Sequence, residues 1–289
     1  MRGKVLGFAA LAAVMVLLLS ACGNDAAEEE TTSPEPSVQT VAEVPVGELV
    51  RPGRLVACMD MPYPPMQFFD EQGEPTGIDV ELLTEVATRI GLEPVFQNSV
   101  YDTIIAALKT GKCDVIWADQ LITPEREAEL TMLPYWESAE VFIVLKGNPE
   151  GISDPTALCG RSAGGQSGAL EIDALEGFSE DCVAAGNEPI DVQQFPKSPD
   201  AMQALQAGHV DVYVASLVTG SYLVQETGDQ FEISYDFGLT GSNLVGISVM
   251  PEHTGLSAAV DAAMQSMVED GTYASILEKY DFGSGSIFE

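Results

Sequence analysis

Three polar residues stand at the carboxyl ends of short apolar runs, and their types suggest ligand binding. Asp60, Asp119 and Ser216 each follow residues with the apolar character of a buried strand. In open α/β sheets, ligands bind outside the carboxyl ends of the strands. Carboxylates there can hold a cationic group, and a pair of them can also do acid–base work. The sequence therefore predicts a polar mouth built from strand ends.

Other catalytic chemistry finds little support in the residue pattern. The chain has no nucleophile–base pair with recognisable spacing and no glycine-rich phosphate loop. Its two histidines, His209 and His253, fall in a helix-to-strand turn and an acidic loop, and no CxxC motif occurs. We therefore expect no metal, no cofactor and no catalysis. The pair Asp60 and Asp119 leaves an enzyme as an alternative.

The elements that must position these residues alternate between strand and helix patterns. In chain order the pattern predicts a strand at 55–59, a helix at 78–90, a strand at 94–96, a helix at 101–110 and a strand at 115–117. Gly91 and Gly111 follow the two helices and are typical helix ends. Alternation of this kind predicts α/β sheets, mainly parallel, with helices on both faces.

One segment of the chain recurs about a hundred residues later. Residues 107–118 are echoed by residues 204–215, with Ala, Leu, Gly, Asp, Val and Ala matching in register. Each copy reads as a helix end, a glycine turn and a strand. The echo predicts two lobes on similar α/β plans, and facing mouths would make the cleft between them the binding site.

Composition narrows the class of protein. The chain has 46% hydrophobic and 20% charged residues, with a formal net charge of −33. Losing Arg2 and Lys4 with a leader leaves 10 basic against 45 acidic residues, which excludes nucleic acid as a partner. Roughly 240 residues remain after the N-terminal segments, enough for one large or two moderate domains.

The first residues predict export and lipidation. Arg2 and Lys4 precede the uncharged apolar run 5–19, the order of a secretory signal. The run ends in Leu-Ser-Ala and then Cys22, which resembles a bacterial lipobox. We expect residues 1–21 to be a signal peptide, Cys22 to carry the lipid, and the protein to lie on the extracytoplasmic face of the cell membrane. An ordinary signal peptide with an incidental cysteine is the alternative.

Residues 22–49 differ in composition from the globular part of the chain. They are acidic, hydroxylated and proline-bearing, so they are expected to form a disordered tether, with a regulatory acidic tail as the alternative. Four further cysteines are present, at positions 58, 113, 159 and 182. We expect a disulfide between Cys159 and Cys182, which flank one short loop-rich region. Cys58 and Cys113 lie in predicted strands of one lobe, and they could be buried thiols instead of a disulfide.

Several spaced motifs resemble a known family. They occupy residues 61–66, 77–82, 122–126, 134–138 and 270–280. Together they resemble the family 3 extracellular solute-binding proteins, receptors of ABC importers for polar amino acids, over about residues 54–280. The resemblance implies a two-lobed periplasmic-binding-protein fold, with one lobe at 50–143 plus 245–289 and the other at 144–244. It also implies a monomer, an ABC permease and ATPase as partners, and a two-strand hinge near 142–145 and 244–247.

The resemblance assigns roles to four residues. Arg126 would grip a ligand carboxylate with its guanidinium fork. Tyr63 and Tyr101 would sandwich the ligand's side chain. Asp60 would bind a cationic side chain. The alternatives are a surface arginine paired with a neighbouring glutamate, core packing for the tyrosines, and a turn-forming aspartate.

The chain also departs from the family pattern. Leu121, Leu170 and Ser216 stand where relatives that bind α-amino acids carry hydroxyls and an aspartate, whereas Asp119 adds a carboxylate. Gln166 lies close enough in sequence to supply a missing polar group. We therefore expect a small zwitterionic or cationic amino-acid-like solute. A ligand-binding sensor subunit is the second alternative.

Overall fold

The computed structural model describes residues 40–228, 230–237, 243–282 and 286–288. The expected signal peptide, Cys22 and the tether as far as residue 39 lie outside the described residues. All described residues belong to one unit of the chain, 38–289. Among the described residues, no helix has the length and apolar character needed to cross a membrane.

The first lobe is built on a five-stranded sheet with the strand order β4-β1-β5-β12-β6. Its strands are β1 (Arg54–Met59), β4 (Glu93–Asn98), β5 (Val115–Ile116), β6 (Thr131–Glu137) and β12 (Leu244–Val249). Its helices are α1 (Ile78–Arg89), α2 (Ile104–Lys109), α3 (Pro124–Glu127), α7 (Thr254–Glu269) and α8 (Thr272–Lys279). A short hairpin, β2 (Phe68–Phe69) and β3 (Pro75–Thr76), and the 3-10 turns Val46–Glu48 and Tyr101–Thr103 complete it.

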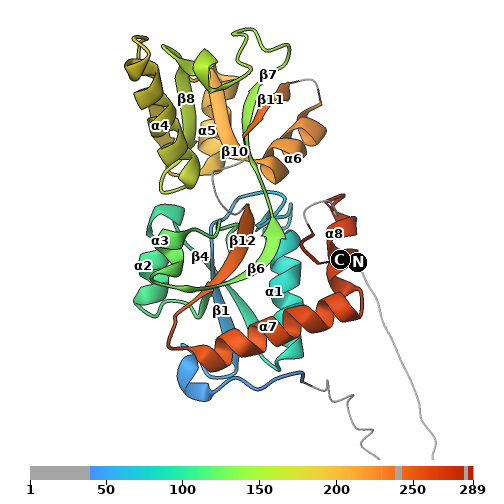
Figure 1. The fold of residues 1–289 in the computed structure, drawn as a ribbon. Coiled ribbons are helices and arrows are strands. Elements are labelled where there is room, and N and C mark those ends of the chain that lie inside the picture. The colour runs from blue at the N-terminus through green and yellow to red at the C-terminus, as the bar shows by residue number, and fades with distance from the viewer. Residues whose placement is uncertain (1–39, 229, 238–242, 283–285, 289) are drawn as a thin grey trace, which may run out of the picture. The chain divides into compact units, whose positions relative to one another are not determined.

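The second lobe is built on a sheet with the order β11-β7-β10-β8-β9. Its strands are β7 (Glu140–Leu145), β8 (Ser162–Gln166), β9 (Asp191–Phe195), β10 (Val212–Ser216) and β11 (Phe231–Phe237). Its helices are α4 (Leu170–Ala184), α5 (Ser198–Gln206) and α6 (Leu217–Thr227), with a 3-10 turn at Pro155–Leu158. Figure 1 shows both sheets with their helices.

Both sheets are mixed rather than mainly parallel, which corrects the expectation from sequence. In the first sheet β1 runs parallel to β4 and β5, but β12 runs antiparallel to β5 and β6. In the second sheet β8 runs parallel to β9 and β10, but β7 runs antiparallel to β10 and β11. The antiparallel members are therefore β7 and β12, the strands that the chain enters as it passes from one lobe to the other.

Each sheet is buried on both faces, because alternate residues of its strands enter different cores. Leu55 and Ala57 of β1 pack with α1 and α7, whereas Val56 and Cys58 pack with α2 on the opposite face. The strands of the second sheet divide in the same way, with α4 on one face and α5 on the other. Burial on both faces explains why the strands read as continuous apolar runs.

The repeated segment builds the same corner in both lobes. Asp114, ahead of β5, accepts a hydrogen bond of 2.7 Å from the backbone N–H of Val56 in β1. Asp211, ahead of β10, accepts one of 2.9 Å from the backbone N–H of Ser162 in β8. Each carboxylate therefore ties the start of its own strand to the neighbouring parallel strand, which is the reason for the repeated aspartate.

The passages between the lobes differ from the predicted hinge. Residues 142–145 lie inside β7 and residues 244–247 inside β12, so both predicted ranges belong to sheets. The chain leaves the first sheet after Glu137 and enters the second at Glu140, and it returns between Phe237 and Leu244. Residues 131–145 are β-rich throughout, so the sequence did not indicate the two-residue passage at Ser138 and Ala139.

The end of the expected tether is ordered against the first lobe. The backbone N–H of Val41 donates a 2.9 Å hydrogen bond to the carbonyl of Arg89, at the end of α1. Glu48 accepts a 2.7 Å bond from the backbone N–H of Leu256, in the first turn of α7. Leu49 packs against the same core. Residues 40–49 are therefore part of the lobe, and the predicted boundary at 49 was wrong.

Two disulfides join the four cysteines of the described residues. One joins Cys159 to Cys182, as expected, and links the 3-10 turn of the second lobe to α4. The other joins Cys58 of β1 to Cys113, beneath α2. From the sequence, Cys58 and Cys113 could form a disulfide or remain buried thiols. The predicted strands did not give the distance between the two residues.

Candidate functional site

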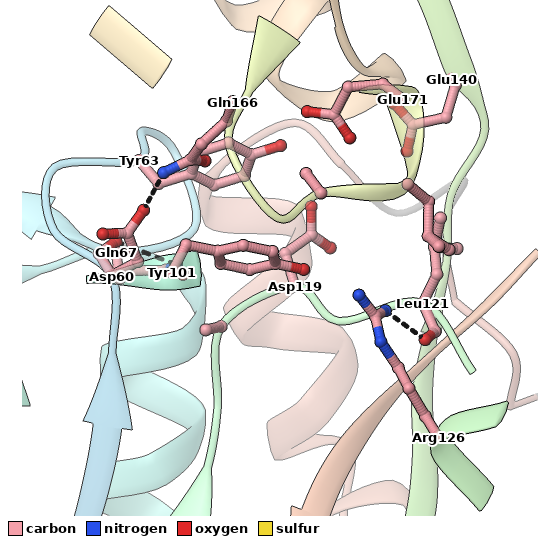
Figure 2. Close-up of a pocket in the computed structure, with 13 residues that line it drawn as sticks. Asp60, Tyr63, Gln67, Tyr101, Asp119, Leu121, Arg126, Glu140, Gln166 and Glu171 are labelled. Carbon is pink, nitrogen blue, oxygen red and sulfur yellow. Dashed lines mark hydrogen bonds between the residues drawn. The ribbon is translucent and has the colours of Figure 1, made fainter. Parts of the chain in front are cut away.

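A narrow cavity is lined by residues of both lobes. Figure 2 shows the lining side chains. They are Asp60, Tyr63, Gln67, Tyr101, Ala118, Asp119, Leu121, Arg126, Glu140, Gln166, Ala169, Leu170 and Glu171. The set contains every residue expected in the binding site except Ser216.

The strand ends meet at this cavity as the topology predicts. Asp60 follows β1, Asp119 follows β5, and Gln166 ends β8. Asp119 has a backbone φ of 50°, a left-handed conformation that aspartate tolerates better than most residues. Figure 2 shows its carboxylate directed into the cavity. Its Oδ1 atom is buried without a hydrogen-bond partner.

Ser216 serves the site indirectly. Its hydroxyl is hydrogen-bonded to that of Tyr63 at 2.8 Å and reaches Thr219 at 3.3 Å. Tyr63 belongs to the first lobe and Ser216 to the second, so the bond links the lobes beside the cavity. The hydroxyls of Ser216 and Tyr63 also interact with the carboxylate of Asp119. Ser216 therefore positions two lining residues.

Asp60 is only 4% exposed. The amide nitrogen of Gln166 donates to its carboxylate at 2.5 Å, and Gln67 donates to its backbone carbonyl at 3.3 Å. Burial raises the pKa of Asp60 to about 6, against the lowering effect of Gln166 and Lys197. Burial likewise raises the pKa of Asp119 to about 6. These shifts show that the charged carboxylates are poorly solvated, a condition that a bound cation relieves.

Arg126 projects from the short helix α3. Thr123 caps this helix by accepting from the backbone N–H of Arg126 at 3.2 Å. The guanidinium Nη1 donates to the carbonyl of Leu121 at 2.7 Å, which fixes the side chain at the cavity wall (Figure 2). Among the ion pairs of the described residues, none involves Arg126, so the alternative of a surface pair with a neighbouring glutamate has no support there.

The two tyrosines expected to hold a ligand both line the cavity. Burial raises the pKa of Tyr101 to about 12 and that of Tyr63 well above its ordinary value, so both phenols stay neutral. Trp117 and Trp136, by contrast, are buried in the core of the first lobe. Leu121 and Leu170 supply apolar wall.

Sequence reasoning missed two carboxylates on the second lobe. Glu140 begins β7 and is 4% exposed, and Glu171 lies in the first turn of α4 and is 8% exposed. Burial raises the pKa of Glu171 to about 7, although backbone N–H groups and Arg126 act against this. A lone glutamate heading the apolar run 141–145 was the available signal for Glu140. Glu171 carried none, because acidic residues are common at helix starts.

The approach of the α4 loop to the first lobe requires a glycine. A Cβ atom on Gly168, whose φ is 80°, would lie 2.7 Å from the Cα atom of Asp102. Asp102 belongs to the 3-10 turn that begins with Tyr101. The glycine therefore allows the loop that precedes Glu171 to lie beside the turn that carries Tyr101.

The cavity combines four carboxylates with one guanidinium. A buried charge without a partner of opposite sign is unfavourable. Such a site therefore suits a solute that carries both a positive charge and a carboxylate. Within the described ranges, no group of three or more His, Cys, Asp or Glu residues is arranged to hold a metal ion.

Comparison with known proteins agrees with this geometry. Residues 55–284 match the family model of bacterial extracellular solute-binding proteins, family 3. The L-cystine-binding protein TcyJ of Escherichia coli is 26% identical, over 80% of this chain and 84% of that protein. The arginine-binding protein ArgT of Corynebacterium glutamicum is also 26% identical, over 92% of this chain and 86% of that protein.

Solved structures share the fold. An ancestral arginine-binding protein bound to arginine is 31% identical and superposes with a TM-score of 0.72, covering 79% of this chain and 98% of that one. An ancestral amino-acid-binding protein, AncCDT-1, a precursor of cyclohexadienyl dehydratase, is 26% identical with a TM-score of 0.71, covering 79% and 95%. The two-lobed α/β architecture, the cavity between the lobes and the family match together show that the chain belongs to the family 3 bacterial extracellular solute-binding proteins.

Proposed function

We propose that this protein is the substrate-binding subunit of an ABC importer and captures an amino-acid-like solute of net positive charge. The observation that carries the proposal is the charge of the cavity. Asp60, Asp119, Glu140 and Glu171 line it together with the single guanidinium of Arg126. A neutral or acidic amino acid would leave several buried carboxylates without a counter-charge, which is unfavourable.

Different residues of the cavity bind different groups of the solute. Arg126 binds its carboxylate through the fork of the guanidinium, because two parallel N–H donors match the two oxygens. Tyr63 and Tyr101 flank its aliphatic stem, and Asp60 lies beside them to receive a cationic end. The names of the relatives, which include several arginine-binding proteins, support this solute class.

The proposed cellular context follows from the N-terminal sequence. Cys22 carries a lipid, the residues after it form a tether, and the mature domain lies on the extracytoplasmic face of the membrane as a monomer. From there it delivers the solute to a permease and ATPase. The described lobe begins at residue 40, so the tether that we propose is shorter than the sequence first indicated.

The protein binds its solute without turning it over, in our proposal. The likeness to AncCDT-1 and the buried carboxylates make this point worth testing. Incubation of the purified protein with each binding solute, followed by mass spectrometry, should recover the solute unchanged. A product that grows with time and disappears in Glu171→Gln would establish an enzyme instead.

Isothermal titration calorimetry tests the solute class. The full chain, purified in mild detergent, is titrated with L-arginine, L-lysine, L-glutamine and L-glutamate. We expect binding of a cationic amino acid and no binding of L-glutamate. Tighter binding of L-glutamine or L-glutamate than of either cationic amino acid would overturn the proposed class.

A further inference from the structure

Glu140 and Glu171 approach one another on the second lobe. Figure 2 shows the two side chains side by side at the top of the cavity, Glu140 from β7 and Glu171 from the start of α4. Besides burial, the charges of Glu171 and Asp119 raise the pKa of Glu140. The charge of Asp119 also raises the pKa of Glu171. The pair is more than nine-tenths buried, so solvent does little to screen this repulsion.

The protein itself leaves these carboxylates incompletely satisfied. Glu140 Oε2 is buried without a hydrogen-bond partner, and so is Asp119 Oδ1 on the other lobe. In the described part of the chain, no ion pair includes any of the three carboxylates. Arg126 acts on Glu171 only electrostatically. A buried, unpartnered carboxylate oxygen facing a cavity calls for a donor from the ligand.

Other features hold Glu171 in this position. Backbone N–H groups of Gln166 and Glu171 itself face its carboxylate. Gly165 leaves room for the side chain, since a Cβ atom there would lie 3.0 Å from Glu171 Cγ. The carboxylate of Glu171 therefore already offsets the partial positive charge at the start of α4, so this helix end is not a site for an anion. Ser216, at the end of β10, is already bonded to Tyr63 and Thr219.

We propose that Glu140 and Glu171, with Asp119 opposite them, form a recognition site for a primary ammonium group of the solute. The assignment rests on the proposed function and goes beyond it, because it names the group bound and the three carboxylates that bind it. A primary ammonium has three N–H donors, one for each carboxylate. A quaternary ammonium has none and would leave the buried oxygens unpaired.

The ammonium can belong to the α-carbon of the solute, with Asp60 receiving the cationic end of the side chain, or it can be that end itself in place of the Asp60 assignment. Three probes separate these sources. L-Lysine carries both groups, 6-aminohexanoate lacks the α-ammonium, and L-norleucine lacks the side-chain ammonium. Dissociation constants for each probe are measured by calorimetry, directly or by displacement, with the full chain and with Glu140→Gln and Glu171→Gln. Asp173→Asn is the matched control, because it removes one exposed carboxylate from the same helix, α4.

We expect both glutamine variants to weaken L-lysine binding at least about 30-fold, as for a buried charge left unpaired, and Asp173→Asn to leave it unchanged. If the α-ammonium occupies the site, the loss persists for L-norleucine and vanishes for 6-aminohexanoate. If the side-chain ammonium occupies it, the pattern reverses. Thermal unfolding of each variant verifies that it is folded.

Three results would overturn the assignment. Unchanged L-lysine affinity in folded Glu140→Gln and Glu171→Gln would remove it while leaving the proposed function intact, and so would an equal loss for all three probes. Failure of the unsubstituted protein to bind either L-lysine or L-arginine would instead remove the proposed solute class, and the ammonium site with it.

Discussion

The side-chain amide of Gln166, at the end of β8, donates a 2.5 Å hydrogen bond to the carboxylate of Asp60, which follows β1. The two strands belong to different sheets, so the bond joins the lobes across the cavity. It also holds the carboxylate that we assign to the cationic end of the solute.

Replacing Gln166 by alanine removes this bond and is expected to weaken solute binding about 10-fold, because a hydrogen bond to a charged group is lost. Calorimetry with the best-binding cationic amino acid measures the change. Gln194→Ala, at an exposed position of β9, is the control. An unchanged dissociation constant in Gln166→Ala would show that the contact does not contribute to binding.

Arg126→Lys keeps the positive charge but loses the fork. We expect the dissociation constant to rise about 30-fold or more, because a lysine cannot donate two parallel hydrogen bonds to a carboxylate. Arg54→Lys, which alters an exposed arginine paired with Glu93, should have no effect. Titration with agmatine, which lacks the carboxylate, provides a second check. Arg126→Lys should change agmatine binding little if the fork binds the carboxylate.

Solute affinity should fall as the pH is lowered from 8 to 5. The pKa values of Asp60 and Asp119 are raised to about 6 and that of Glu171 to about 7, so these carboxylates gain protons across this range. A protonated carboxyl no longer attracts a cation, and the ligand-induced rise in melting temperature should shrink accordingly. A rise that stays constant from pH 8 to 5 would contradict the proposed charge pairing.

The ligand-free protein should show the opposite trend over the same range. These three groups have folded pKa values above their unfolded values, near 4, so their charged forms destabilise the fold. That destabilisation reaches its maximum at pH values above the folded pKa values. It decreases as the pH falls toward 5, because the carboxylates become protonated. The free energy of unfolding, measured by urea titration, should therefore rise between pH 8 and 5, and replacing Glu171 by glutamine should flatten the trend.

The two disulfides close loops of different length, with sequence separations of 55 for Cys58–Cys113 and 23 for Cys159–Cys182. Loop-closure entropy predicts that replacing either pair by serine lowers the free energy of unfolding by about 3 to 4 kcal/mol, with the larger loss for Cys58–Cys113. Urea titration under oxidising conditions measures both. Equal stability of the oxidised and reduced proteins would show that the bridges do not stabilise the fold.

Replacing Cys22 by alanine should release the protein from the membrane fraction. The lipid attaches to the cysteine thiol in our proposal, and the described residues contain no helix able to cross a membrane. Labelling of cells with a radioactive fatty acid should mark the unsubstituted protein and not the variant. Retention of the variant in the membrane fraction would point to another means of attachment.

Much of the fold could be predicted from local pattern. Helix α1 lies at Ile78–Arg89, close to the predicted range 78–90, because its apolar spacing and the following glycine are local signals. The strands β1 and β5 were placed to within a residue or two for the same reason. Sheet order was not predictable in this way, since β12 pairs between β5 and β6, strands that lie far earlier in the chain.

The cavity was predicted where strand ends define it and missed where distant packing does. Asp60 and Asp119 follow parallel strands, so topology alone directs them to one edge. Glu140 owes its position to β7, whose antiparallel place beside β10 depends on a chain passage without sequence markers. Ser216 also lies at the end of a strand, but its hydroxyl is hydrogen-bonded to that of Tyr63 from the other lobe.

The central place of β12 in the first sheet also fixes an order of assembly. Every strand of the second sheet lies between Glu140 and Phe237, so that sheet can be completed by one uninterrupted stretch of chain. In the first sheet, β6 pairs only with β12 among the described strands, and β12 begins at Leu244. A chain that emerges N-terminus first therefore completes its inner, inserted lobe before its outer one, and the first sheet stays divided until about the last sixth of the protein arrives.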